Sequence, residues 1–152
     1  TTIQGAFHEN LFQNNHFNPG IQSAMNLQQM TETIRNHPDF SKVGMILSHN
    51  GVVRGSSRDG RPVSGIEIRV DREKLAQIIA ESRSHDGIVE VLVELAEENR
   101  FLPVGADVMM LVVAGDIREN VFDTLKTTLD AIKATVTAKT EYFIEEGKDT
   151  DR

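Results

Sequence analysis

The sequence predicts an α+β domain in which helices cover one side of a mostly antiparallel or mixed sheet. Segments with helical apolar spacing alternate along the chain with segments typical of strands, in the order helix, two strands, helix, two strands, helix, short strand. That order suits helices packed on a sheet. The length of 152 residues suits one domain with a core of its own.

We expect the chain to divide into three parts. Residues 1–20 are polar and rich in Asn and are expected to form an N-terminal arm, residues 21–146 the folded domain, and residues 147–152 a frayed tail. The domain should open with a short amphipathic helix that ends near Asn36. This helix is predicted from apolar residues at helical spacing, namely Ile21, Met25, Met30 and Ile34.

The strands are predicted from apolar runs and from alternation. A strand over residues 43–55 carries a polar interruption at residues 48–50, and residues 63–70 alternate between apolar and polar. Residues 107–115 are almost continuously apolar, which favours a central position in the sheet. The remaining strands are expected over residues 87–96 and at the start of the C-terminal segment.

Two longer helices complete the predicted domain. Asp71 is a good N-cap for a helix over residues 72–85. The last helix is expected to be capped by Asp116, to open at Arg118 and to close at Lys133. We expect it to pack on the sheet through an apolar stripe formed by Phe122, Leu125, Leu129 and Ile132.

Composition excludes several classes of function. The 23 Asp and Glu outnumber the 16 Lys and Arg, so broad binding to nucleic acid or to a membrane surface is not expected. No export signal is indicated, and we expect a cytoplasmic protein. There is no cysteine, so any sulfur that the protein handles must arrive on another molecule. The five histidines show no pair at metal-ligand spacing, and we expect neither a metal site nor a cofactor.

The basic residues allow two interpretations, solvated surface charges or ligands for an anion. Arg118 opens a helix, where the macrodipole disfavours a cation, so another interaction is indicated for it. Arg118 and Lys133 are fifteen residues apart on one helix, which is about 22 Å. If both serve one small ligand, two chains must therefore meet at the site.

An ordered set of short motifs resembles one enzyme family. The motifs are "GVVRG" with Arg54, "PVGADVMMLVVAG", "DIRENVF" with Arg118, "DAIK" with Lys133, and "KTE" with Lys139 and Glu141. Over residues 21–146 the chain resembles the large, catalytic subunit of molybdopterin synthase, as a divergent member.

The resemblance implies a hammerhead-like α+β fold and a homodimer flanked by ubiquitin-like small subunits. Each small subunit ends in Gly-Gly with a thiocarboxylate and delivers sulfur to cyclic pyranopterin monophosphate, which forms the dithiolene of molybdopterin. The resemblance implies catalytic roles for Lys133 and Lys139. It implies substrate binding by Arg54, Arg118, Thr140 and Glu141.

The sequence also departs from the family pattern. Ile117 stands where the family has His, the segment before Lys139 is one residue short, and residues 48–50 are polar where an apolar or aromatic run is usual. The alternative is therefore a non-catalytic dimeric relative that binds a pterin phosphate or a ubiquitin-like partner.

Overall fold

The computed structural model describes residues 26–145. Within that range the chain forms three α-helices, one 3-10 helix (Phe40–Lys42) and six strands in two three-stranded antiparallel sheets. The predicted α+β class is confirmed. The expected arm and tail, together with Ile21 and Met25 of the first predicted helix, lie outside the described residues. None of the helices described is long and apolar enough to cross a membrane.

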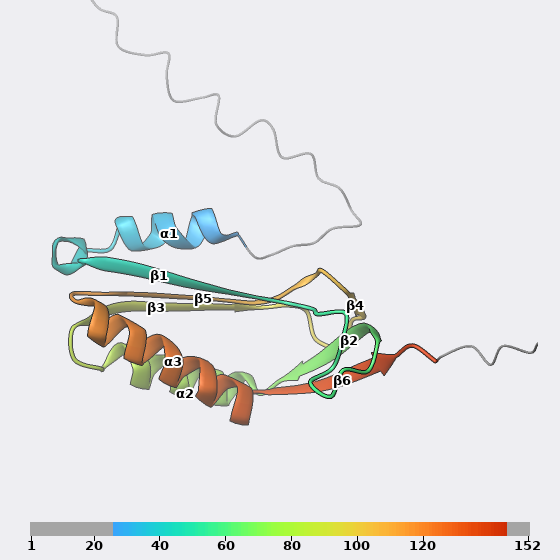
Figure 1. Ribbon diagram of the computed structural model, residues 1–152. Coiled ribbons are helices and arrows are strands. Elements are labelled where there is room, and N and C mark those ends of the chain that lie inside the picture. Colours follow the sequence, from blue (N-terminus) through green and yellow to red (C-terminus); the bar gives the residue numbers. More distant parts are fainter. Residues whose placement is uncertain (1–25, 146–152) are drawn as a thin grey trace, which may run out of the picture.

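The first sheet is built around the apolar strand that the sequence predicts to be central. This strand, β5 (Asp107–Gly115), lies between β1 (Met45–Val52) and β3 (Ile88–Leu95) (Figure 1). Both neighbours are antiparallel to it. Because β5 is paired on both edges and covered on both faces, four consecutive residues are fully buried: Leu111, Val112, Val113 and Ala114.

The second sheet has β2 (Val63–Val70) between β4 (Leu102–Pro103) and β6 (Thr137–Phe143). The two-residue β4 is absent from the predicted elements because so short a strand carries no periodicity. It lies very close to β2, where a Cβ added at Gly65 would be 2.4 Å from the carbonyl oxygen of Leu102. Glycine is therefore required at this pairing.

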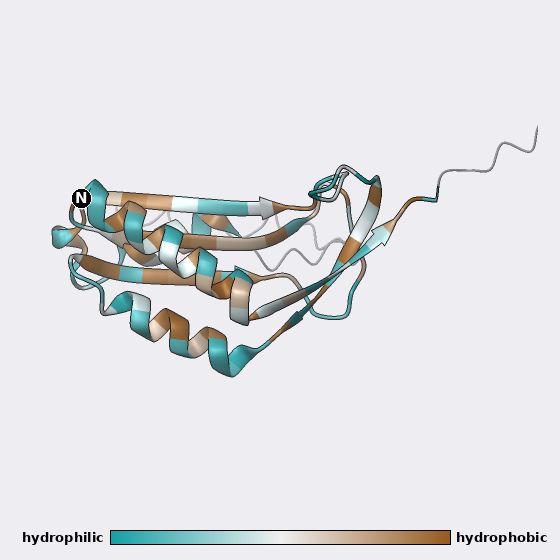
Figure 2. Ribbon diagram, turned by 60° about the horizontal axis from the view of Figure 1, so that its bottom comes forward, coloured by the Kyte–Doolittle hydropathy of each residue, from teal (hydrophilic) through white to brown (hydrophobic). Residues whose placement is uncertain are grey.

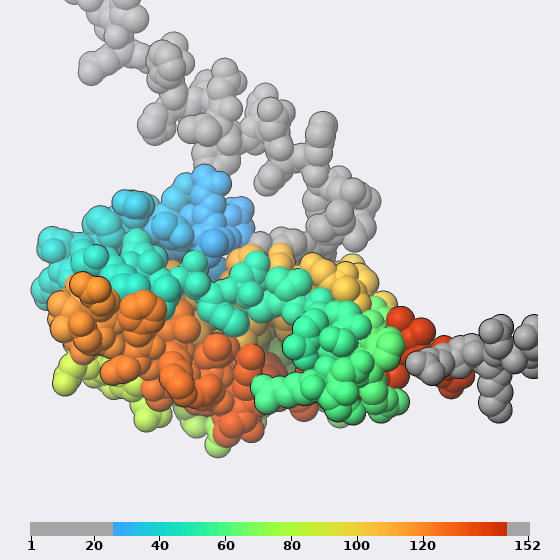
Figure 3. All heavy atoms as spheres, in the orientation of Figure 1, coloured from blue at the N-terminus to red at the C-terminus, as the bar shows by residue number. Residues whose placement is uncertain are grey.

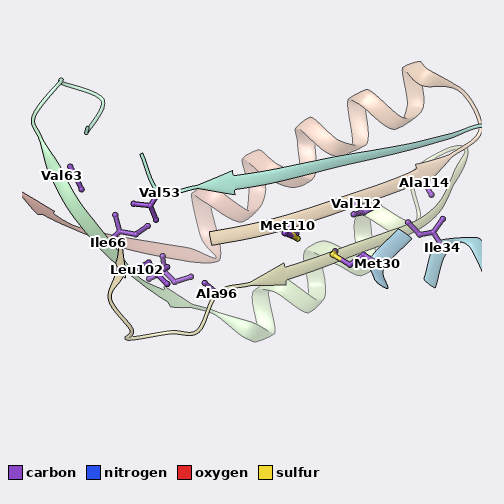
Figure 4. Packing of buried hydrophobic residues seen from close by; sticks show 11 residues of the cluster. Met30, Ile34, Val53, Val63, Ile66, Ala96, Leu102, Met110, Val112 and Ala114 are labelled. Atoms are coloured by element: carbon purple, nitrogen blue, oxygen red, sulfur yellow. The ribbon is translucent and has the colours of Figure 1, made fainter. Parts of the chain in front are cut away.

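The helices lie on opposite faces of the first sheet. α2 (Arg72–Arg83) and α3 (Arg118–Thr135) share one face, as predicted, whereas the short α1 (Leu27–Arg35) covers the other (Figure 1). Figure 2 shows hydrophilic and hydrophobic residues mixed along these helices, as expected for helices with one buried side. The cluster on the α1 side includes Met30, Ile34, Met110, Val112 and Ala114 (Figure 4).

One predicted helix cap is confirmed and one is wrong. The Asp71 side chain accepts a hydrogen bond from the Lys74 backbone N–H at 3.0 Å, and α2 begins one residue after Asp71. Asp116 does not occupy the cap of α3, which is Ile117. The Asp116 carboxylate instead accepts hydrogen bonds from the Ile117 backbone N–H and from the Asn120 side chain.

The predicted packing face of α3 is wrong in one residue. Phe122 is 52% exposed, whereas its neighbour Val121 and the more distant Ile132 are fully buried and Leu125 and Leu129 are partly buried. Part of the buried face is polar, because Thr128 lies against α2 and its hydroxyl is 2.6 Å from that of Ser82. The buried face of α3 is therefore turned toward α2, and Phe122 lies outside it.

We predict that Ile132→Ala lowers the free energy of unfolding by about 2–5 kcal/mol, because it leaves a cavity under α3. Phe122→Ala should change it by less than about 1 kcal/mol within a single chain, because the ring is half exposed. Denaturant titrations at several protein concentrations measure both values and separate any contribution from subunit contacts. A concentration-independent loss above about 3 kcal/mol for Phe122→Ala would contradict this packing.

Candidate functional site

The connection between α3 and β6 places the two predicted catalytic lysines at the junction of the two sheets. Ile132 and Val136 are buried together with Met109 of β5, and they fix the last turn of α3 on the first sheet. Strand β6 begins directly afterwards and pairs with β2 in the second sheet. Lys133 therefore lies on the last turn of α3 and Lys139 on β6, on either side of this junction.

Lys133 is exposed in the single chain. Its charge acts on His49 of β1, and α3 packs directly against β1 (Figure 3). Burial, and then the charge of Lys133, hold the pKa of His49 below its usual value of 6.5. The imidazole is therefore neutral near pH 7.

His49 is the residue of this site that the sequence reasoning did not place. On β1 it shares a face with Met45 and Leu47, which pack on the α3 side of the sheet. Its Nε2 atom is shielded from solvent and has no hydrogen-bond partner among residues 26–145. The ring leans over Gly51, where an added Cβ would be 3.3 Å from Nε2. The available signal was a polar residue at an inward position of an otherwise apolar strand face.

Lys139 and Glu141 form an ion pair on one face of β6. The Lys139 Nζ is 3.4 Å from the Glu141 Oε1, and the Glu141 side chain is only 24% exposed. They lie opposite Ile68 and Ile66 of β2 and share the face of those residues. Thr140 points to the other face, because successive strand residues alternate. The structure thus brings together Lys139 and Glu141, two of the three site residues predicted on this strand.

Arg54 lies beyond the end of β1, at the same end of the first sheet as Lys133. This follows from the register, since Gly51 pairs with Met109 and Met109 packs against the last turns of α3. The Arg54 Nε donates to the carbonyl oxygen of Ser56 at 2.9 Å. The guanidinium has five N–H donors and uses one of them here.

The loop after Arg54 is attached to β6. The Arg61 guanidinium carbon is 3.7 Å from the centre of the Phe143 ring, which is a cation–π contact. The backbone N–H of Ile144 also donates to the carbonyl oxygen of Pro62 at 3.0 Å. These contacts hold the loop that follows β1 against the end of β6, and so help to fix Arg54 relative to the second sheet.

Arg118 lies at the opposite end of α3 from Lys133. The helix is 18 residues long, so the two are separated by about 22 Å along its axis. The Arg118 side chain is 78% exposed and lies 4.0 Å from the Glu119 carboxylate. Two large apolar side chains beside it are also exposed, Ile117 at 54% and Phe122 at 52%. One chain therefore does not bring Arg118 to the lysines.

Comparison with known proteins extends these observations. No curated protein sequence matches the chain. Among solved structures, the crystal structure of molybdopterin synthase from Staphylococcus aureus superposes with a TM-score of 0.66 at 19% identity, over 80% of this chain and 88% of that chain. The MoaE protein of molybdopterin biosynthesis from Burkholderia ambifaria gives 0.60 at 17% identity, over 82% and 87% of the two chains.

A third similar structure is a complex of subunits 1 and 2 of molybdopterin-converting factor from Helicobacter pylori, with a TM-score of 0.58 at 12% identity, over 80% of this chain and 86% of that chain. At these identities the superpositions establish a shared fold. The sequence itself carries the family assignment, because residues 21–135 match the MoaE protein family. The match covers most of the chain, and the resemblance to the molybdopterin synthase large subunit is confirmed: the chain belongs to the MoaE protein family.

Proposed function

We propose that the chain is the large, catalytic subunit of a cytoplasmic molybdopterin synthase. Membership of the MoaE family places it in the biosynthesis of the molybdenum cofactor. In the proposed reaction, a ubiquitin-like small subunit that ends in Gly-Gly delivers the sulfur of its terminal thiocarboxylate. The acceptor is cyclic pyranopterin monophosphate, and the product is the dithiolene of molybdopterin. The absence of cysteine is compatible with sulfur that arrives on a partner.

The observation that carries this proposal is the placement of two lysines on either side of the α3–β6 junction. The charge of Lys133 acts on the imidazole of His49, and Lys139 is paired with Glu141. A lysine amine suits proton transfer or attack on an acyl carbon. A guanidinium suits bidentate binding of phosphate, and Arg54 lies at the same end of the first sheet as Lys133.

Polar residues of β6 are proposed to contribute to substrate binding. Glu141 is the better placed of the two predicted residues, because it shares a face with Lys139. The Thr140 side chain lies on the other face of the strand, so any contact that it makes with substrate comes from that side. The complex from Helicobacter pylori supports a second, different subunit as the partner.

A homodimer is proposed because one chain leaves Arg118 remote from Lys133. In a symmetric dimer, Arg118 of one protomer and Lys133 of the other can meet, and the arrangement occurs twice. The exposed Ile117 and Phe122 support self-association, since apolar side chains gathered around a charged residue are typical of subunit contacts.

The alternative is a dimeric relative that binds a pterin phosphate or a ubiquitin-like partner without catalysis. Ile117 favours it, because an apolar and exposed side chain precedes Arg118 where the family resemblance implies an imidazole. The two proposals differ in whether product forms from a thiocarboxylated small subunit and the cyclic precursor. Binding that depends on the lysines, without any product, would favour the alternative.

We predict that Lys133→Ala lowers dithiolene formation by about 1000-fold or more, whereas Lys139→Ala causes a large but smaller loss. The assay uses saturating thiocarboxylated small subunit and cyclic pyranopterin monophosphate, beside thermal melts of each variant. Lys126→Ala is the matched control, since it removes the same charge from α3 and breaks only an exposed pair with Asp130. Full activity of Lys133→Ala would exclude the catalytic role.

A second prediction tests the shared site. Arg118→Ala and Lys133→Ala chains should each be nearly inactive alone. After subunit exchange in an equal mixture, about a quarter of the sites should contain both native residues and regain activity, because each mixed dimer holds one intact site. Native mass spectrometry checks that exchange has occurred. A mixture that exchanges fully but stays inactive would show that the two residues do not meet across a dimer.

A further inference from the structure

We propose that His49 is a positioning residue for Lys133. The His49 ring accepts a hydrogen bond from the Lys133 side-chain nitrogen and so orients it. During the reaction the ring also takes up a proton from that nitrogen. This inference rests on the proposed function for the role of Lys133. It assigns a task to a residue that the family resemblance leaves without one, since an apolar or aromatic run is usual at residues 48–50.

The two side chains belong to β1 and α3, which pack against each other. His49 pairs with Leu111 in the sheet register, and its side chain lies on the face that α3 covers. Lys133 follows the buried Ile132 on the last turns of that helix. The two side chains are not hydrogen-bonded to each other in the single chain. Lys133 is exposed, however, and its flexible four-carbon stem allows the ammonium to move toward the ring.

The surroundings leave Lys133 as the charged group that acts on the imidazole. Along the same face of β1 the neighbours are Met45 and Leu47, which are apolar. Asn50 points to the opposite face and donates to Asp107. One turn before Lys133 on α3, Asp130 is already paired with Lys126 at 2.6 Å. Burial and the nearby ammonium both favour the neutral ring, which keeps a lone pair available.

The buried Nε2 atom argues that this histidine is more than core filling. A phenyl ring would occupy a similar volume without burying a polar atom that has no partner, and such an atom normally destabilises a protein. Gly51 leaves the space over which the imidazole leans. A local feature that lowers stability without an evident structural gain is typical of functional sites.

The proposed step is a proton transfer. When the Lys133 nitrogen loses a proton, the N–H electron pair remains on that nitrogen and a new N–H bond forms on the His49 ring. The resulting imidazolium releases its proton to water, and no other reactant is needed. The ring must be neutral to accept the proton, so acid should suppress the step.

The first test measures the contact independently of catalysis. In the full chain, the His49 imidazole resonances, assigned by their loss in His49→Gln, should titrate with a midpoint below 6.5. Lys133→Ala should move that midpoint upward, because the removed positive charge no longer opposes protonation. The control Lys126→Ala should leave it unchanged. An unchanged midpoint in Lys133→Ala would overturn the proposal.

The second test uses dithiolene formation. His49→Phe should lower kcat by about 10–100-fold with KM nearly unchanged, and His49→Gln should recover part of the loss because its amide oxygen accepts a hydrogen bond. The wild-type rate should fall as the pH drops through the midpoint measured for His49, and both variants should lose that dependence. Ser48→Ala, on the opposite face of β1, is the control for disturbance of the strand.

Stability distinguishes this role from a structural one. His49→Phe should raise the melting temperature at pH 7 by about 2–4 °C, because it removes the unpartnered nitrogen. Below pH 6.5 the difference in melting temperature should widen. In the wild type the unfolded chain takes up a proton on His49 more readily than the native state does, so acid favours unfolding. His49→Phe lacks this effect. A lower melting temperature with activity reduced only in proportion to the folded fraction would overturn the proposal.

If the wild type forms no product, the proposed function fails, while the resonance titration still decides whether His49 and Lys133 interact.

Discussion

The burial of β5 on both faces is the constraint on which the rest of the structure depends. Its pairing with β1 and β3 forms the first sheet, and alternate residues along it face α1 or the α2–α3 layer. The strand then turns tightly into α3. Gly87, in the turn between α2 and β3, lies against this corner: its φ is +73°, and a Cβ there would be 2.2 Å from a carboxylate oxygen of Asp116. Glycine is therefore required in the turn that packs against the connection from β5 to α3.

The start of α3 is thus fixed at one end of the sheet, and its last turns are fixed at the other by Ile132 and Val136. The position of Lys133 follows from these two anchors. Between them, the buried hydroxyls of Thr128 and Ser82 satisfy each other at 2.6 Å, and Thr124 does the same with the His85 ring at 3.0 Å. Polar groups at the α2–α3 contact are paired, which is the usual rule for buried polar atoms. His49 departs from that rule on the same side of the sheet.

Local sequence patterns were sufficient to predict much of the fold. Strands β2 and β5 have the bounds that alternation and continuous apolarity predict, and Asp71 caps α2 as expected. The errors arise where tertiary contacts decide. β4 is too short to carry a period, α1 lies on the face opposite the other helices, and the polar α2–α3 contact turns Phe122 to solvent.

In the candidate site, too, local relations could be predicted from the sequence and relations set by tertiary packing could not. Lys139 and Glu141 are two residues apart on one strand, so their shared face could be predicted from the sequence, and the same alternation separates Thr140 from them. His49 and Lys133 are 84 residues apart in the sequence, and only the packing of α3 on β1 brings their elements together. No local spacing signals that contact. Arg118 shows the opposite case, because helix geometry alone separates it from Lys133.

The acidic charge of the protein is compatible with the proposed anion site. The net charge of -7 is spread over the whole chain, and salt screens exposed charges beyond about 10 Å. An approaching phosphate or thiocarboxylate therefore responds mainly to the groups nearest to it. At the last turn of α3 those groups include Lys133, and the His49 ring, on which its charge acts, is neutral but able to gain a proton. An anion bound beside Lys133 would offset the charge that disfavours protonation of His49, so binding and protonation would reinforce each other at this contact.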